Sequence, residues 1–160
     1  MSATAATLSV GNTKAIRGLL VGWLLCGILD ISSAIIITLY RHGSPFRMLQ
    51  GIASGMLGQS SFQGGTATAA LGLFLHFFIA FCAATVFFLA SRKLSFLTRH
   101  PVISGLLYGI AVYTVMYWIV VPLSAIHRHP ASLSAIPLPV TVHMFCVGLP
   151  ISLGVWRYSR

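Results

Sequence analysis

The 160-residue chain is 57% hydrophobic and only 7% charged, and its ten Lys and Arg residues stand against one acidic residue, for a formal net charge of +9. Soluble domains average about 25% charged residues, so a soluble globular protein is excluded, because too few polar residues remain to cover its surface. The basic residues form short clusters beside apolar segments, which is typical of membrane topology rather than of nucleic-acid binding. The composition predicts an integral membrane protein whose first partner is the lipid bilayer and which binds no nucleic acid.

Residues 1–13 are small and polar and predict a flexible N-terminal tail, followed by a four-helix transmembrane domain over residues 14–160. A bilayer core requires about 20 apolar residues per helix. Segments that meet this length lie at about 18–40, 67–91, 102–125 and 137–156. The predicted fold class is therefore an all-α polytopic membrane protein with four transmembrane helices.

The first apolar segment has a second interpretation. Lys14 and Arg17 before an apolar stretch that contains Ser32-Ser33-Ala34 are also typical of a signal peptide with its cleavage site. Cleavage there would remove Asp30, the only acidic residue. The apolar run continues directly through residues 35–37, however, and so reaches the length of a full span. We therefore expect an uncleaved signal anchor.

A shorter helix is expected between the first two spans. After Ser44-Pro45, apolar residues recur at helical spacing over about 45–59, and Gly64-Gly65 ends the segment. Proline is tolerated in the first turn of a helix, so Ser-Pro is a suitable helix start. The segment is too short to cross a bilayer, so it is either an interfacial helix, which we favour, or a re-entrant one.

The charge asymmetry predicts the orientation. An excess of Lys and Arg marks the cytoplasmic side, so both termini should be cytoplasmic. Seven basic residues fall on the side of the termini and three on the other side: Lys14, Arg17, Arg92, Lys93, Arg99, Arg157 and Arg160 against Arg41, Arg47 and Arg128.

Short similarities between the two halves suggest a parallel two-helix duplication. The segment from Gly18 to Gly22 matches Gly105 to Gly109 at an offset of 87 residues, and Arg41-His42 matches Arg128-His129 at the same offset. Such a duplication is one route to a symmetric membrane fold, although a chain rich in Leu and Gly also produces matches by chance. In a duplication Asp30 would correspond to Tyr117.

Small and polar residues recur at helical spacing in three spans and predict the faces that pack together, because small residues let membrane helices approach closely. These stripes are Gly22, Cys26, Asp30, Ser33 and Ala34; Ala69, Gly72, His76, Ala80 and Ala83; and Gly105, Gly109, Tyr113 and Tyr117. A carboxyl group at bilayer depth costs about 2.5–3.5 kcal/mol and normally faces a bundle interior with a partner. At 1.5 Å rise per residue, the candidate intramembrane polar site comprises Asp30, His76, Tyr117 and His143 in one layer.

Three interpretations of this layer remain open. In a proton or cation pathway, Asp30 binds the ion and a histidine relays protons. In a metal or haem site, His76 and His143 are ligands. In a purely structural role, Asp30 fixes helix packing. We expect neither a metal nor a cofactor, since single buried histidines are more often hydrogen-bonded than ligating. A single acid cannot form a catalytic carboxylate pair, and phosphate-binding glycine motifs are absent, so an enzyme is not indicated.

Several stretches resemble a family of small four-span bacterial inner-membrane proteins of unknown function. They are Gly27 to Asp30, Ser44 to Gly55, Phe62 to Gly65, Gly105 to Gly109, Val121 to Ala125 and His143 to Pro150. The resemblance implies four spans and the inner membrane of a bacterium, but no catalytic role and no site residue. From the residues we expect either a proton- or cation-coupled transport or relay module centred on Asp30, with a homo-oligomer or other membrane proteins as partners, or a non-catalytic structural component.

Overall fold

The structure, a computed structural model, describes residues 3–126 and 136–159, and these residues form helices and connecting turns without a strand. Its helices that are long and apolar enough to cross a membrane are Thr13–Tyr40, Gly65–Lys93, Pro101–Leu123 and Pro137–Tyr158. Each begins and ends within a few residues of a predicted span. The predicted all-α membrane fold is therefore confirmed.

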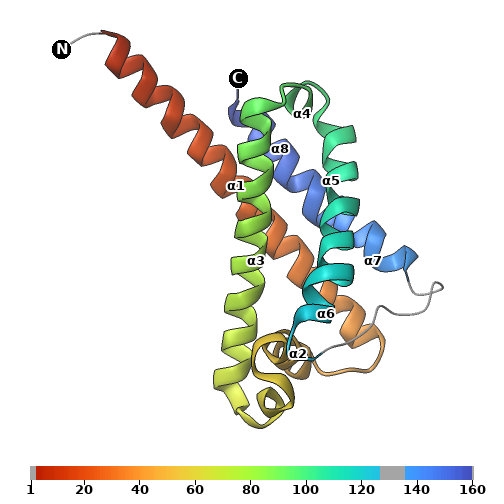
Figure 1. The fold of residues 1–160 in the computed structure, drawn as a ribbon. Helices are drawn as coiled ribbons and strands as arrows, with labels where there is room; N and C mark the ends of the chain where they lie inside the picture. Colours follow the sequence, from red (N-terminus) through yellow and green to blue (C-terminus); the bar gives the residue numbers. More distant parts are fainter. Residues whose placement is uncertain (1–2, 127–135, 160) are drawn as a thin grey trace.

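The first helix is longer than its predicted span. α1 (Ala3–Tyr40) begins upstream of the apolar segment, and Figure 1 shows its N-terminal part projecting beyond the other helices. The backbone of residues 3–13 is thus helical where the composition predicts a tail without regular structure. The flexibility of that segment stays a prediction.

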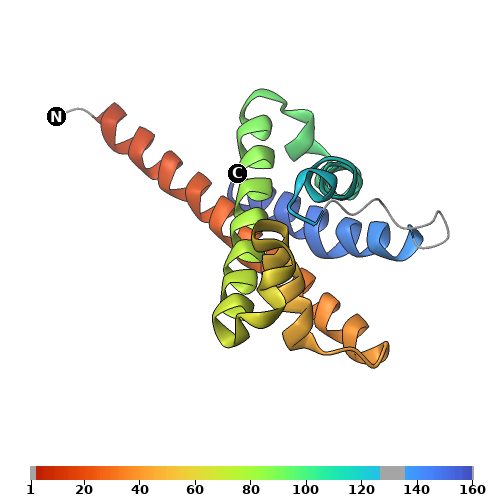
Figure 2. The ribbon, with the colours of Figure 1, turned by 60° about the horizontal axis from the view of Figure 1, so that its bottom comes forward.

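The predicted short helix between the first two spans is confirmed as α2 (Pro45–Leu57). Ser44 caps it, because its hydroxyl accepts a hydrogen bond from the backbone N–H of Arg47, and Pro45 occupies the first turn. A 3₁₀ helix, η1 (Gly58–Gln63), then leads into α3 (Gly65–Lys93). Both views place α2 beside the start of α3, at the end of the bundle opposite α4 (Figures 1 and 2). An interfacial or re-entrant position in the bilayer stays a prediction.

A buried polar network fixes α2 against α3. The side chain of Gln50 is 2% exposed, and its Nε2 donates to the carbonyl of Gly65 and to Oγ1 of Thr68, both at 3.2 Å. The Ser61 hydroxyl donates to the backbone carbonyl of Gln50 at 2.8 Å. Gly72 of α3 lies directly against the backbone of Leu49, where any side chain would collide. These contacts make α2 part of the bundle.

The second half of the chain is less regular than the first. Its elements are α4 (Phe96–Arg99), α5 (Pro101–Val115), η2 (Met116–Val120), α6 (Val121–Leu123), α7 (Pro137–Val142), η4 (His143–Gly148) and α8 (Leu149–Tyr158). Both η2 and η4 are π-helical turns that end two residues before a proline, Pro122 and Pro150. Proline lacks an N–H and its ring crowds the carbonyl four residues earlier, and a wider turn accommodates this defect. The third and fourth spans are therefore each irregular in the turn before a proline.

The fourth span packs between α1 and α5. Gly22 of α1 meets Ile151 and Gly154, and Gly105 and Gly109 of α5 meet Gly148. The two glycine segments that suggest a duplication therefore have the same role, which is to let a helix approach the fourth span closely. The duplication itself stays a prediction, and its Arg128-His129 match lies outside the described residues.

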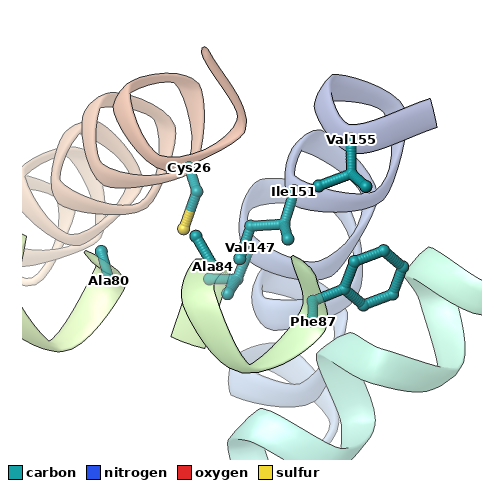
Figure 3. Packing of buried hydrophobic residues seen from close by; sticks show 7 residues of the cluster. All are labelled: Cys26, Ala80, Ala84, Phe87, Val147, Ile151 and Val155. Carbon is teal, nitrogen blue, oxygen red and sulfur yellow. The ribbon is translucent and has the colours of Figure 1, made fainter. Parts of the chain in front are cut away.

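The apolar core forms where α1, α3 and the fourth span meet (Figure 3). Its buried residues are Cys26, Ala80, Ala84, Phe87, Val147, Ile151 and Val155. The predicted stripes of small residues supply part of this core and of its surroundings, since Cys26, Ala69, Ala80 and Tyr113 are all buried. The helical spacing of small residues in the sequence thus predicted part of the helix faces that pack together.

Candidate functional site

A polar cavity within the bundle

A cavity of about 260 Å³ lies between the spans, and all four predicted site residues, Asp30, His76, Tyr117 and His143, line it. They come from α1, α3, η2 and η4 respectively. The layer predicted from helix rise is therefore present as one shared space. Most of the remaining lining is apolar, including Cys26, Ile31, Ala80, Val112 and Val147.

Asp30 and His76 approach each other in this cavity. Oδ2 of Asp30 lies 3.9 Å from Nδ1 of His76, and the two side chains are 23% and 12% exposed. This separation exceeds the length of a hydrogen bond. In the described part of the chain the Asp30 carboxyl receives no hydrogen bond, and its one ion-pair contact there is with His76.

The other nitrogen of His76 defines where its proton sits. Nε2 lies 3.0 Å from the backbone carbonyl oxygen of Gly27, which can only accept, so Nε2–H is the donor. This contact is close because Gly27 has no side chain: a Cβ there would lie 2.5 Å from the Phe77 ring. A neutral His76 therefore presents the lone pair of Nδ1 to Asp30.

The Asp30–His76 contact depends on which of the two groups carries a proton. An ionised Asp30 and a neutral His76 would set two acceptors against each other in a region of low dielectric constant, where repulsion is strong. One proton, placed either on the Asp30 carboxyl or on Nδ1 of His76, converts that repulsion into attraction. Because the Gly27 contact uses Nε2 in both forms, proton gain at Nδ1 does not disturb the helix contact.

His143 shows a similar division of roles within its own span. Its Nδ1 lies 2.8 Å from the carbonyl of Pro139, one turn earlier, so Nδ1–H donates and Nε2 carries the free lone pair. In the described part of the chain Nε2 has no hydrogen bond, and the His143 side chain lines the cavity. The ring packs edge-on to Tyr113 and Tyr117, at centroid distances of 5.6 and 6.1 Å. Each histidine therefore has one fixed nitrogen and one available nitrogen.

Two features of the cavity were missed from the sequence. Met48 and Ile52 of α2 form part of its wall, so the short helix closes the cavity at that end. Their i, i+4 spacing marks an apolar face, but which space that face covers depends on tertiary packing. The second feature is the Gly27 carbonyl, a backbone group that has no signature in the sequence.

The metal or haem interpretation of the two histidines stays a prediction. Within residues 3–126 and 136–159, no group of three or more His, Cys or Asp side chains is placed to hold a metal ion. Structural and catalytic metal sites normally have at least three protein ligands. His76 would also have to give up its bond to Gly27 to become a ligand through Nε2.

No protein-family model, curated protein or solved structure matches the chain. The resemblance to a bacterial inner-membrane family therefore stays a prediction. Four helices that are long and apolar enough to cross a membrane identify an integral membrane protein.

Proposed function

We propose that the chain is a proton relay or proton-coupled transport module in which Asp30 and His76 share one titratable proton inside the membrane. The observation that carries this proposal is the 3.9 Å approach of Oδ2 to Nδ1 in a cavity that His143 and Tyr117 also line. Intramembrane acids mark ion and proton pathways by default, and histidine titrates near neutral pH.

Proton movement in this proposal uses the histidine nitrogens that make no hydrogen bond to the backbone, which are Nδ1 of His76 and Nε2 of His143. A cavity of about 260 Å³ with four polar side chains has room for water, which needs only about 10–15 Å³ and two to four polar partners. A bridging water, or a small side-chain rotation, brings Asp30 and Nδ1 of His76 within proton-transfer reach. The proton leaves the carboxyl and binds Nδ1, and Nε2 of His143 is the next available acceptor in the same cavity.

We also propose an orientation in the membrane and an oligomeric assembly for this protein. The excess of basic residues beside the α4 end of the bundle supports an orientation with both termini in the cytoplasm of a bacterial cell. Four spans leave little room for a continuous pathway, so we propose that a homo-oligomer or another membrane protein completes the route across the bilayer.

One specific observation favours a second candidate, a structural component without transport. The hydrogen bond from His76 to Gly27, together with the Trp23 indole N–H that donates to the Phe77 carbonyl at 2.8 Å, fastens α3 to α1. In that role Asp30 would only orient His76. The two candidates differ in whether loss of the titratable groups affects proton movement or stability alone.

Proton flux separates the two candidates. We expect wild-type protein in proteoliposomes containing a pH-sensitive dye to conduct protons after a pH jump. The His76→Gln substitution keeps an amide donor for Gly27 but cannot titrate, and should lower the flux about tenfold or more.

The matched control is His42→Gln, which removes an exposed histidine from the turn after α1 and should leave flux unchanged. Equal flux in wild type and His76→Gln, with a lower melting temperature for the variant, would support the structural component instead.

A further inference from the structure

An apolar groove of about 350 Å³ runs between α3 and α5, beside the polar cavity. Cys82, Val86, Val115 and Val120 line only the groove, whereas Ile79, Ala83, Val112 and Met116 line both spaces. At the α4 end, the Tyr108 hydroxyl donates to the Ala83 carbonyl at 2.7 Å and ties the two helices together. The groove and the cavity thus share one boundary, in which Ala83 is small, Met116 is flexible, and Ile79 and Val112 are β-branched.

The surroundings of the two spaces are chemically different. The groove lies along two membrane-spanning helices, and exposed residues such as Val86 and Val115 face the hydrocarbon of the bilayer. The cavity contains Asp30, the only acidic residue of the chain. A molecule that occupies both spaces therefore needs an apolar tail and a head group that complements a carboxylate.

We propose that the groove and the cavity together bind an amphiphilic cation, with its alkyl chain between α3 and α5 and its ammonium head beside Asp30. This inference rests on the proposed function, because the cation and the shared proton compete for the same carboxylate. When the cation binds, Asp30 is ionised and one proton leaves the Asp30–His76 pair for water. One positive charge enters as one leaves, so the charge of the site is conserved.

The alkyl tail and the ammonium head of the cation contribute differently to binding. An alkyl chain moving from lipid into the groove gains little, because both are apolar, so the tail mainly guides lateral entry and fits the groove. The head group gains the charge pair with Asp30 in a region of low dielectric constant, which provides selectivity for cations. The cavity is larger than the roughly 150 Å³ that binds benzene in an engineered protein core, so a trimethylammonium group fits.

Equilibrium binding of radiolabelled dodecyltrimethylammonium to the full chain in phosphatidylcholine nanodiscs tests the proposal. We expect saturable binding above that of empty nanodiscs, with proton release into a weakly buffered solution. Asp30→Asn should weaken it about tenfold or more, which corresponds to roughly 1.4 kcal/mol. Dodecyl sulfate, with the same chain and the opposite charge, should not bind saturably.

A second pair of variants tests the groove. Val115→Trp places a bulky ring in the groove and should weaken dodecyltrimethylammonium binding, but not that of tetramethylammonium. Val102→Trp is the same change at an exposed position of α5 that does not line the groove, and should have no effect. If Val115→Trp binds each of the two cations as strongly as wild type does, the proposal that the groove holds the alkyl chain is overturned.

The two proposals fail differently. Absence of saturable cation binding in a protein that still conducts protons would overturn this inference and leave the proton relay in place. Absence of proton flux, and of any titration of Asp30, would overturn the proposed function on which it rests.

Discussion

Gly27 controls the distance between α1 and α3 at the polar cavity. Because it has no side chain, the Phe77 ring lies against α1 and His76 reaches the Gly27 carbonyl. Nδ1 of His76 is thereby directed at Asp30. A single missing methyl group thus sets the geometry of the proposed proton site.

Gly27→Ala tests this dependence. Its Cβ would collide with Phe77, and overpacking of this kind costs about 1–3 kcal/mol. We expect a lower melting temperature in detergent and reduced proton flux, since His76 loses its anchor. Adding Phe77→Leu removes the collision and should recover part of both losses. A double variant no better than Gly27→Ala alone would contradict the assignment.

At the scale of elements, the close approach of α5 to the fourth span depends on glycine at both surfaces. A Cβ at Gly148 would lie 2.7 Å from Cα of Gly109, and also against the backbone of Gly105. Backbone atoms cannot move aside as a side-chain tip can, so the helices would have to separate.

Gly148→Ala is therefore expected to destabilise the bundle by about 1–3 kcal/mol or more. Gly51→Ala in α2 is the matched control, because no atom lies within 4 Å of the Cβ position. In a helix interior alanine is more stable than glycine by about 0.5–1 kcal/mol, so this variant should not lose stability. Denaturation of both variants in one detergent gives the comparison, and similar stabilities would contradict the packing described.

α2 depends on buried hydrogen bonds for its position. Gln50→Leu removes both hydrogen bonds from Nε2, to the Gly65 carbonyl and to Oγ1 of Thr68, a loss of about 1–3 kcal/mol. We expect faster amide hydrogen exchange throughout α2, while the exposed control Gln59→Leu should exchange like wild type. Unchanged protection in Gln50→Leu would show that α2 is held by other contacts.

At the scale of the whole molecule, the spans and the polar layer could be predicted from the sequence. Span length and apolar composition placed the four helices, and the fixed rise of a helix placed Asp30, His76, Tyr117 and His143 at a common depth. Depth does not determine rotation about the helix axis. The approach of Nδ1 to Asp30 and the closure of the cavity by Met48 and Ile52 therefore required the three-dimensional packing.

The orientation is a testable property of the whole chain. In a variant without native cysteines, we expect a cysteine at Ser44, before α2, to react with a membrane-impermeant thiol reagent on intact bacterial cells. A cysteine at Ser95, between α3 and α4, should react only after permeabilisation, because the basic end is proposed to be cytoplasmic. The reverse pattern would invert the proposed orientation.

Infrared difference spectroscopy across a pH titration tests the shared proton most directly, because Asp30 is the only acidic side chain. We expect the carbonyl band of a protonated carboxyl group to appear reversibly in wild type and to be absent in Asp30→Asn, which retains the terminal carboxyl. His76→Gln should shift the midpoint of that band, while His42→Gln should not, since coupled groups titrate together. Absence of the Asp30 band at every pH, or the same band midpoint in wild type and His76→Gln, would contradict a proton shared by Asp30 and His76.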